Sequence, residues 1–520
     1  MLTSRLSLTL GVFCSSSVVL GGLVQKPHLV LPPGSQQNRD AVVDIFTTSY
    51  EAYRTYAYGH DNLLPISRKF SDVRNGWGAS IVDAMSTMHI MGLNDFFSEA
   101  VQFASNIDFN KSRTADTVSV FETTIRYLGG LLSAYELSGQ QFPALLSKAK
   151  EVADKMAFAW VAGNDIPYGH LNFSTNTPSH SQSNIAEAGT LTMEWATLTK
   201  YTRNDTYREL SERSARRIAS QKSSHHHASS GLPAQGIDPA TGTPSGGYVT
   251  WGGGSDSYFE YLIKYARLND AADPMFVDAW RAAVDSSIHT LLKTSKIGDL
   301  VYLADYDASK SIRHVGSHLA CFHGGNWLFG GRLLDNDTIV DIGLQLVDAC
   351  WNTYASTETG IGPETFAYTS SESDGFYTGG APPTAKQLAF NAEHGFYITA
   401  GSYILRPEVL ESNFYAWRVT GDRKYIDRAA SAVKSFNRFL SVNNTFAGLY
   451  DVNSSSSLKI DDTESFWFAE VLKYLYLTFD DPSHVSLDEY VFNTEAHPFK
   501  LSPPKRIYGS HSSSPTKPLS

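Results

Sequence analysis

Amphipathic helical segments recur along most of this 520-residue chain, with little strand-like alternation between them. They follow one another at intervals of roughly 25–35 residues, and no break between them resembles an interdomain linker. One segment, 119–137, places Ile125, Leu128 and Leu132 along a single apolar stripe. The pattern predicts one all-α domain of about twelve to fourteen helices. The expected helices cover 41–57, 78–93, 119–137, 145–161, 185–201, 206–221, 257–268, 274–293, 336–351, 407–420, 424–440 and 464–479.

The length of the chain alone favours a different organisation. At about 150 residues per domain, 520 residues would form two to four domains. Helical hairpins closed into a ring would instead keep such a length in one domain. We expect residues 1–24 to form a signal peptide or signal anchor, 38–500 the helical domain and 501–520 a flexible tail rich in Ser, Pro and Lys.

Composition excludes two classes of protein. With 42 Lys+Arg against 53 Asp+Glu, the net charge of -11 argues against a nucleic-acid binder, which needs a basic face for phosphates. With 42% hydrophobic and 12% aromatic residues, the chain is too apolar to be disordered. Few charges and many aromatic rings have two interpretations: a large buried core, or a cleft whose rings cover the apolar faces of sugars.

The first residues are typical of a secretory signal. Arg5 precedes an apolar stretch over 6–24, which is close to the length of an uncleaved anchor. We favour cleavage, because Ser15-Ser16-Ser17 and Gly21-Gly22 weaken the stretch. No comparable apolar segment follows, so we expect no stable membrane span after cleavage.

The cysteines and sequons also point to the secretory pathway. Cys14 lies in the predicted signal, which leaves Cys321 and Cys350. An even count in a secreted chain favours a disulfide, here worth about 3–4 kcal/mol for a loop of about 30 residues. Two buried free thiols are the alternative. Six Asn-X-Ser/Thr sequons predict glycosylation at Asn110, Asn172, Asn204, Asn336, Asn443 and Asn453.

Acidic residues recur beside aromatic residues, glycines and prolines near the ends of the expected helices. Glycoside hydrolysis needs two carboxyl groups across the scissile bond, one to deliver a proton and one to activate water or attack. An N-cap, a salt bridge or a solvated face is the alternative for each acid, so the pattern by itself indicates only an acid-based hydrolase as one option. The segments are Phe121-Glu122, Ser255-Asp256, Pro363-Glu364, Arg406-Pro407-Glu408, Thr463-Glu464 and Asn493-Thr494-Glu495.

Sequence motifs for metals and phosphates are absent. The chain has no His-Glu-x-x-His motif, no paired Cys clusters and no EF-hand loop. The consecutive His225, His226 and His227 cannot all face one ion, so we expect a solvated loop there. An acid-ringed cavity could still hold a hard cation through oxygens and waters. For His318, a structural role and a pocket role both remain open.

Six long blocks carry a resemblance to a known family: 70–92, 118–137, 246–264, 318–322, 403–421 and 461–498. Over about 42–499, the chain resembles glycoside hydrolase family 47, the class I α-1,2-mannosidases, and in particular their secreted fungal branch. The resemblance implies an (α/α)7 barrel with a pocket on its axis. It also implies a calcium-dependent, inverting exo-α-1,2-mannosidase that trims high-mannose N-glycans from Man9 towards Man5.

The resemblance also implies roles for single residues. Glu122 matches the acid that protonates the leaving oxygen through a water, and Glu408 matches the general base. Asp256 matches a second essential acid, and Glu364 a further pocket acid that is sometimes given the donor role. The division of labour among the four is unsettled in the family, and we rank Glu122 and Glu408 first. An inverting pair should stand roughly 6.5–9.5 Å apart.

Calcium and substrate positions follow from the same resemblance. Thr494 matches the threonine that binds Ca²⁺ through its hydroxyl and carbonyl oxygens, with waters in most other positions, which explains the missing ligand motif. Cys321 and Cys350 match the family disulfide. Residues that match pocket positions around the sugar and the waters are Arg126, Glu187, His318, Arg406, Glu411, Glu464, Phe466 and Glu495.

Four positions concern specificity or depart from the family pattern. Gly254 stands where some members carry an arginine that restricts cleavage to one branch, so we expect broader trimming here. Ser86 stands where many members have Asp, and we expect an effect on helix contacts rather than chemistry. His323 lies where the family varies. The polar stretch 368–386 is longer than usual, and its role cannot be assigned from the sequence.

Two other functions remain as alternatives. One is a glycan-binding quality-control lectin on the same fold with little hydrolytic activity, although the acids, Arg126 and Thr494 are all present. The other is an (α/α)6 glycosidase such as a glucoamylase, which would lack the Thr494 motif. We expect a monomer that acts on high-mannose N-glycans of glycoproteins, binds no nucleic acid, and is either secreted or lumenal in the Golgi or vesicles.

Overall fold

The computed structural model describes residues 23–221, 231–372, 375–505 and 507–510. The predicted signal, except for its last two residues, the three histidines at 225–227 and most of the predicted tail therefore lie outside the described residues. Within the described part, no helix combines the length and the apolar character needed to cross a membrane.

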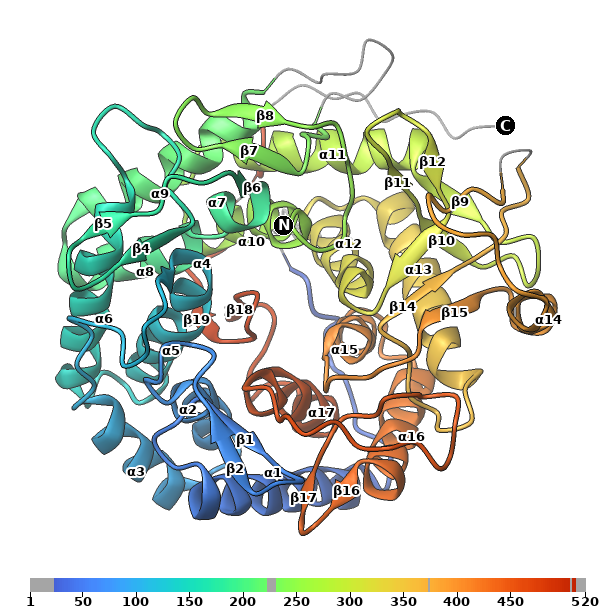
Figure 1. Cartoon of the computed structure of the whole chain (residues 1–520), viewed down its shortest axis with the longest axis horizontal. Helices are drawn as coiled ribbons and strands as arrows, with labels where there is room; N and C mark the ends of the chain where they lie inside the picture. The colour runs from blue at the N-terminus through green and yellow to red at the C-terminus, as the bar shows by residue number, and fades with distance from the viewer. Residues whose placement is uncertain (1–22, 222–230, 373–374, 506, 511–520) are drawn as a thin grey trace, which may run out of the picture.

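Helices alternate along the chain between an outer and an inner ring, which together form a barrel of seven helical hairpins (Figure 1). The outer helices are α1 (Ser35–Tyr56), α3 (Asn94–Ala104), α6 (Pro143–Met156), α9 (Asp205–Ala219), α11 (Met275–Thr290), α13 (Asp337–Ala355) and α16 (Arg423–Phe439). The inner helices are α2 (Ala79–Ile90), α5 (Gly129–Leu137), α8 (Thr192–Thr202), α10 (Asp256–Leu268), α12 (Phe322–Leu333), α15 (Glu408–Thr420) and α17 (Leu472–Phe479). This (α/α)7 architecture confirms the predicted fold class.

Short segments extend or connect these helices. Three of the inner helices are preceded by such segments. The helix α4 (Val120–Glu122) and the π-helix η1 (Thr123–Leu128) precede α5, α7 (Ile185–Gly189) precedes α8, and the π-helix η4 (Trp467–Val471) precedes α17. The others are the 3-10 helices η2 (Ala157–Ala159) and η3 (Leu319–Cys321), and the helix α14 (Ala385–His394).

Burial explains the two rings. Every residue of α10 except Asp256 is buried, and all of α17 is buried, because inner helices pack on both neighbours and on the outer ring. Outer helices such as α16 bury one stripe and expose the opposite face, as an amphipathic surface helix does. The ring closes where α17 packs against α1 and where η4 packs against α2, which joins the two ends of the domain.

Three helices lie outside the predicted set. In α12, Gly324-Gly325 and Gly330-Gly331 lower helix propensity, yet they allow close packing. A Cβ on Gly330 would clash with the ring of Trp280, so the contact between α12 and α11 requires glycine. The other two helices, α3 and α14, are short, and α14 buries only Asn391.

The strands are too short for alternation to be recognised in the sequence, since none described exceeds four residues. They form antiparallel sheets of two or three strands. The strands are β1 (Asn62–Leu64), β2 (Lys69–Ser71), β3 (Val118–Ser119), β4 (His170–Asn172), β5 (Thr177–Pro178), β6 (Ser183–Asn184), β7 (Gly236–Asp238), β8 (Thr243–Ser245), β9 (Leu292–Thr294), β10 (Val301–Leu303), β11 (Asp305–Tyr306), β12 (Ile312–Arg313), β13 (Val315–Ser317), β14 (Thr365–Ala367), β15 (Tyr397–Ala400), β16 (Ser441–Val442), β17 (Thr445–Phe446), β18 (Tyr490–Phe492) and β19 (Pro498–Lys500).

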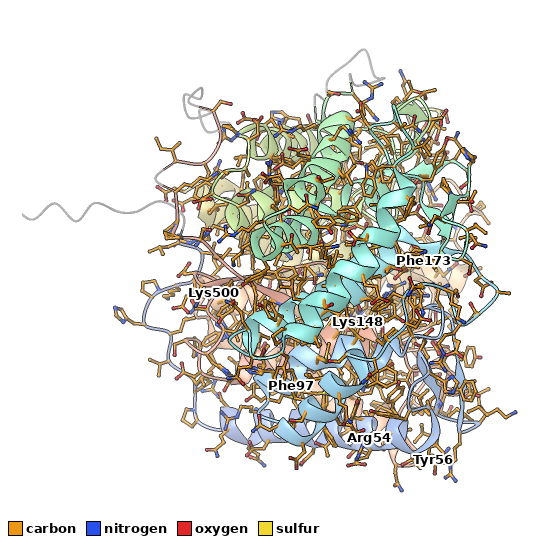
Figure 2. All side chains as sticks on the ribbon, turned by 90° about the vertical axis from the view of Figure 1, so that its left-hand side faces the viewer. Arg54, Tyr56, Phe97, Lys148, Phe173 and Lys500 are labelled. Carbon is orange, nitrogen blue, oxygen red and sulfur yellow. A yellow bond between two sulfur atoms is a disulfide. The ribbon has the colours of Figure 1, made fainter. Side chains whose placement is uncertain are left out.

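The outer surface carries ion pairs between and along the outer helices. Figure 2 shows the basic partners of two of these pairs, Arg54 and Lys148. Arg54 of α1 bonds Glu99 of α3 at 2.7 Å, and Lys148 of α6 bonds Glu151 at 2.8 Å. Phe97 of α3 lies beneath this layer and is buried. These partly exposed pairs each contribute little to stability, so the barrel is held mainly by its apolar layer between the rings.

One hairpin, β18–β19, lies in the middle of the ring (Figure 1). The side chain of Asn493 fixes its turn by bonding the carbonyl of Ile125 and the carboxylate of Glu194. His497 bonds Asp83 through Nε2 and Ser86 through Nδ1. Ser86 thus makes a buried contact between α2 and the hairpin, which helps to hold Thr494 on the barrel axis.

The disulfide and the sequons can be located. Cys321 and Cys350 form a disulfide with Cα atoms 5.9 Å apart, which joins η3 to α13 and excludes two free thiols. Among the six predicted glycosylation sites, four are exposed and two are half-buried. The exposed sites are Asn110, Asn172, Asn204 and Asn443, and the half-buried ones are Asn336 and Asn453.

Candidate active site

A cavity of about 570 Å³ opens along the barrel axis, within the range of small-molecule sites. It is lined by the N-terminal ends of inner helices, by Thr494 and Glu495 of the β18–β19 turn and by loops between strands. Eleven of the residues predicted from the sequence line it: Glu122, Arg126, Glu187, Asp256, Arg406, Glu408, Glu411, Glu464, Phe466, Thr494 and Glu495.

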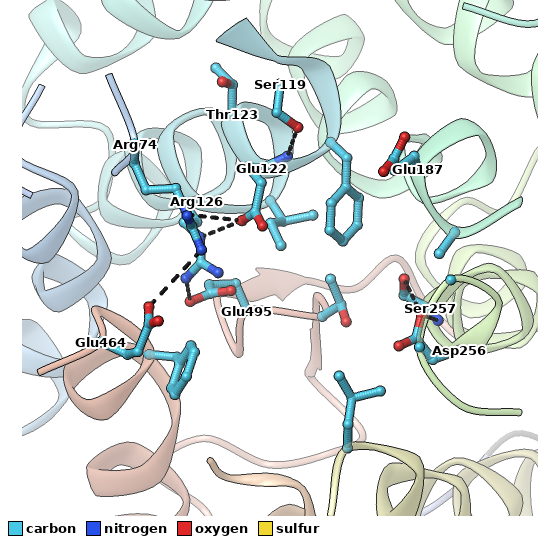
Figure 3. Close-up of a pocket in the computed structure, with 18 of the residues that line it drawn as sticks. Arg74, Ser119, Glu122, Thr123, Arg126, Glu187, Asp256, Ser257, Glu464 and Glu495 are labelled. Atoms are coloured by element: carbon cyan, nitrogen blue, oxygen red, sulfur yellow. Dashed lines mark hydrogen bonds and ion pairs between the residues drawn. The ribbon is translucent and has the colours of Figure 1, made fainter. Parts of the chain in front are cut away.

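One wall is organised around Arg126 (Figure 3). This guanidinium, 6% exposed, donates to Glu122 at 2.8 Å and to Ser465 at 3.0 Å, and it also bonds Glu495. It lies in the π-helix η1, whose wide turn places Glu122 and Arg126 on the same side. Burial raises the pKa of Glu122, but the positive charges of Arg126 and Arg74 lower it by more than burial raises it. The pKa of Glu122 therefore lies below the ordinary value for glutamate.

The opposite wall carries Asp256, the first residue of α10 (Figure 3). Its Oδ1 accepts hydrogen bonds from the backbone nitrogen and the hydroxyl of Ser257, at 2.7 and 3.2 Å. Burial and the nearby charges of Glu260 and Glu408 outweigh these bonds and raise the pKa of Asp256 to about 7. A carboxyl with that pKa retains its proton in weakly acidic solution.

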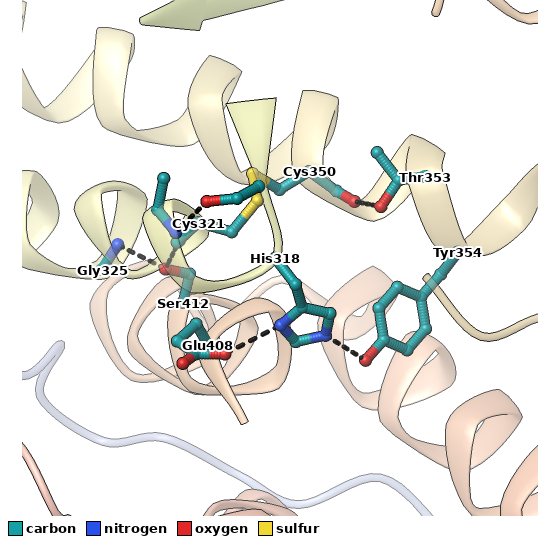
Figure 4. The surroundings of a disulfide bond; sticks show 10 residues. His318, Cys321, Gly325, Cys350, Thr353, Tyr354, Glu408 and Ser412 are labelled. Carbon is teal, nitrogen blue, oxygen red and sulfur yellow. Dashed lines mark hydrogen bonds and ion pairs between the residues drawn. A yellow bond between two sulfur atoms is a disulfide. The ribbon is translucent and has the colours of Figure 1, made fainter. Parts of the chain in front are cut away.

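Glu408 begins α15 and belongs to a chain of hydrogen bonds (Figure 4). His318 bonds Glu408 through Nδ1 at 2.8 Å and the Tyr354 hydroxyl through Nε2 at 2.7 Å. The pKa of Glu408 is raised by burial, but the bond from His318 and the charge of Arg406 reduce it to a value below the ordinary one. Glu408 is therefore an ionised acceptor held in one orientation.

Two predicted residues contact residues that line the cavity but do not line it themselves. His318 is 1% exposed and contacts Glu408, so it acts on the pocket through that carboxylate. Glu364 binds Arg406, whose Nε donates to both carboxylate oxygens at 2.8 Å. The structure thus places Glu364 beside Arg406 and outside the lining of the cavity.

The floor of the cavity concentrates buried carboxyl groups. Burial raises the pKa of Glu411, against the charge of Lys264. Burial and the charges of Glu495, Glu408 and Glu411 raise the pKa of Glu470. Within the described chain, no three His, Cys, Asp or Glu residues form a cluster able to hold a metal ion directly. The surplus of oxygen ligands nevertheless fits a hard cation that is bound partly through waters.

Sequence reasoning missed four residues of this site: Arg74, Asp83, Glu260 and Glu470. The last three share a recognisable signal, because each is an acid inside a helix whose other positions are mostly apolar. A charge on a helix without a polar face is seldom buried unless it is paired or functional. Arg74, in a loop, carries no such signal.

Comparisons with known proteins agree with this geometry. A sequence model described as Glycosyl hydrolase family 47 matches residues 45–501. The probable mannosyl-oligosaccharide α-1,2-mannosidase 1B of Aspergillus clavatus is 40% identical over 503 residues, covering 92% of this chain and 96% of the relative. The mannosyl-oligosaccharide α-1,2-mannosidase 1B of Emericella nidulans is 39% identical over 488 residues, covering 91% and 94%. The solved α-1,2-mannosidase of Trichoderma reesei superposes with a TM-score of 0.86 at 37% identity, covering 90% and 99%.

Proposed function

Because the chain belongs to glycosyl hydrolase family 47, we propose that it is a calcium-dependent, inverting exo-α-1,2-mannosidase that trims high-mannose N-glycans from Man9 towards Man5. It is a glycoside hydrolase with α-1,2-mannosidase activity, as its relatives indicate. The finer features, namely the metal, the stereochemistry and the extent of trimming, rest on the residues of the cavity.

The observation that carries the proposal is a pair of carboxyl groups that line one cavity and whose surroundings shift their pKa values in opposite directions. Asp256 has a pKa raised to about 7, whereas the pKa of Glu408 is lowered. Hydrolysis with inversion requires one carboxylic acid to protonate the leaving oxygen and one carboxylate to activate water on the other face of the sugar. Divergent environments for two acids are the usual sign of such a pair.

Glu408 fits the general base. Its bond to His318 and its proximity to Arg406 keep it ionised, so it can accept a proton from a water that attacks the anomeric carbon. Tyr354 holds the other side of the His318 ring and thereby fixes the orientation of the carboxylate.

The proton donor is better matched by Asp256 than by Glu122, which the sequence ranks first. Arg126 and Arg74 hold Glu122 in its ionised form, which opposes a donor role. An ionised Glu122 can instead orient a sugar hydroxyl or stabilise positive charge that develops on the ring. We therefore assign proton delivery to Asp256 and charge stabilisation to Glu122.

Calcium fits the residues near Thr494. The turn that holds Thr494 is fixed by Asn493, and the adjoining floor carries Glu411, Glu470 and Glu495, whose pKa values are raised by burial and by neighbouring acidic groups. When bound there, Ca²⁺ would orient mannose hydroxyls and offset the charge of these acids. Thr494 would supply its hydroxyl and carbonyl oxygens, and the acids would hold the waters.

Removal of calcium should abolish mannose release. We expect EDTA to reduce hydrolysis of a high-mannose N-glycan at least tenfold, and excess Ca²⁺ to restore it, since a lost cation leaves the floor repulsive and the sugar unoriented. Calcium should also raise the midpoint of thermal unfolding, because a ligand that binds only the folded state stabilises it. Hydrolysis that persists in EDTA would contradict the metal; glycan binding without any release would favour a lectin.

Gly254 tests the breadth of trimming. It borders the cavity with a φ of 84°, and a Cβ there would lie 2.9 Å from the amide of Gln235. Gly254→Arg should narrow the products, leaving glycans larger than Man5, because a guanidinium would contact one branch. Gly254→Ala is the matched control for backbone strain. An unchanged product profile in the arginine variant, or the same change in both variants, would argue against the idea.

The setting of this activity is also a proposal. The signal predicted at 1–24, the six sequons and the disulfide support a glycoprotein that is secreted or lumenal in the Golgi or vesicles. We further propose that it works as a monomer on the N-glycans of other glycoproteins.

A further inference from the structure

A second cavity, of about 660 Å³, adjoins the catalytic one. The two share Gly253, so the glycine segment 252–254 forms part of the wall between them. The side chain of Gln235 fixes this segment by donating to the carbonyl of Gly253 at 2.6 Å, and Gln235 itself lines the second cavity. Any ligand long enough to leave the catalytic cavity over this ridge reaches the second one directly.

The walls of the second cavity combine aromatic rings with hydrogen-bonding groups. Phe366 and Tyr397, from β14 and β15, contribute buried rings. Opposite charges stand close together: the Tyr248 hydroxyl donates to Asp305 at 2.5 Å and accepts from Arg313 at 3.0 Å. Rings that cover C–H surfaces, beside a carboxylate and a guanidinium that bond hydroxyls, are suited to a neutral polyol such as a sugar.

A largely buried histidine also lines the second cavity. His323 lines the cavity, is 5% exposed, and its Nδ1 bonds no group in the described chain. Burial lowers the pKa of His323 to about 3, so the ring is neutral and offers one donor and one acceptor. Nδ1 itself is enclosed by protein, so a ligand hydroxyl in the cavity would meet the other ring nitrogen, Nε2.

We propose that the second cavity binds a mannose residue on another branch of the glycan whose terminus occupies the catalytic cavity. The inference rests on the proposed function and adds a recognition subsite to it. Its parts are the shared ridge at Gly253, the rings of Phe366 and Tyr397, the pair Asp305 and Arg313, and the neutral ring of His323. A branched substrate spans both cavities, whereas a disaccharide occupies only the first.

The test compares two substrates, Man9 glycan and α-1,2-linked mannobiose, in two variants. Thr399→Trp fills the second cavity from an exposed strand position. His323→Phe keeps a ring of similar shape but removes the nitrogens, and since Nδ1 bonds no protein group, the variant should fold. We expect each to raise KM for Man9 about tenfold and to leave mannobiose hydrolysis unchanged. Thr177→Trp, at an exposed position of β5 that lines neither cavity, is the control.

The outcomes separate the two proposals. Wild-type protein that cleaves neither substrate overturns the proposed function and the inference together. Wild-type protein that cleaves both, with variants that lose nothing on Man9 or lose equally on both substrates, overturns the inference alone. A selective loss on Man9 in both variants, with a normal Thr177→Trp control, supports the subsite.

Discussion

Asp256→Asn should lower kcat for mannose release by about 10²–10⁴-fold, the usual contribution of a positioned proton donor. An amide preserves the shape of the side chain and can still pack beside Ser257, but it cannot deliver a proton to the leaving oxygen. Substrate affinity should change little, so the loss belongs to kcat. Steady-state kinetics on Man9 glycan, with folding verified by thermal unfolding, measures this effect.

The pH profile of kcat/KM identifies the donor. If Asp256 is the acid, activity should fall as the pH rises through about 7, because the Asp256 carboxyl then loses the proton that it must deliver. On the acid side, activity should fall only below the lowered pKa of Glu408, when the base becomes protonated. If Glu122 were the donor, its lowered pKa would end activity at a much more acidic pH.

Glu122→Gln is the matched comparison. Both variants should be slow, but only Asp256→Asn should lose the alkaline limb near pH 7. If the limb instead survives in Asp256→Asn and vanishes in Glu122→Gln, proton delivery belongs to Glu122, as the sequence-based ranking has it.

Arg126→Leu should destabilise the fold by about 3–5 kcal/mol, the cost of stranding buried carboxylates. Arg126 is 6% exposed and pairs with Glu122 at 2.8 Å and with fully buried Asp83 at 3.4 Å. Leucine fills part of the space but neutralises neither acid. Chemical denaturation of wild type and variant, in the same calcium concentration, gives the difference in unfolding free energy.

The pH dependence of that loss has a definite sign. Arg126 helps to depress the pKa of Glu122, so this stabilisation exists above 4.5, the ordinary glutamate pKa, and is lost as the pH falls. The gap between wild type and variant should therefore narrow in acid. Arg423→Leu is the control: its pair with Asp427 is mostly exposed, and its removal should cost under about 0.5 kcal/mol. Equal losses for the two variants would mean that Arg126 is not the electrostatic centre of the wall.

The sequence predicts the barrel well where hydrophobic spacing and burial agree. Helices such as α10 and α15 appear close to their predicted bounds, because their apolar residues leave no other register. It fails at α12, where the glycine pairs weaken the local preference and tertiary packing against Trp280 overrides it. The β18–β19 hairpin is equally invisible, since three-residue strands carry no alternation.

The candidate site, too, can be predicted from the sequence only in part. Its motif residues are found from the sequence because they resemble a family, but the depth of a side chain is not encoded in a motif. Glu364 and His318 therefore resemble cavity residues in the sequence, whereas in the fold they contact the lining residues Arg406 and Glu408 and do not line the cavity themselves. Protonation is also a property of the assembled site: Asp256 and Glu122 are equivalent acids in the sequence, and only their neighbours in the fold separate them.

The two wide turns, η1 and η4, give two inner helices a change of phase. A π turn holds one residue more than an α turn, and one residue corresponds to about 100° of rotation. The residues on the two sides of each wide turn therefore point in different directions around the helix axis. Those before the turn line the cavity, and those after it pack against the neighbouring helices. Deleting one residue at the end of η1 would leave a continuous helix able to pack, yet it would rotate Glu122 and Arg126 by about 100° relative to the packed face of α5. In these two helices, a change of one residue in the wide turn would leave the packing of the barrel intact but would move the residues of the active site.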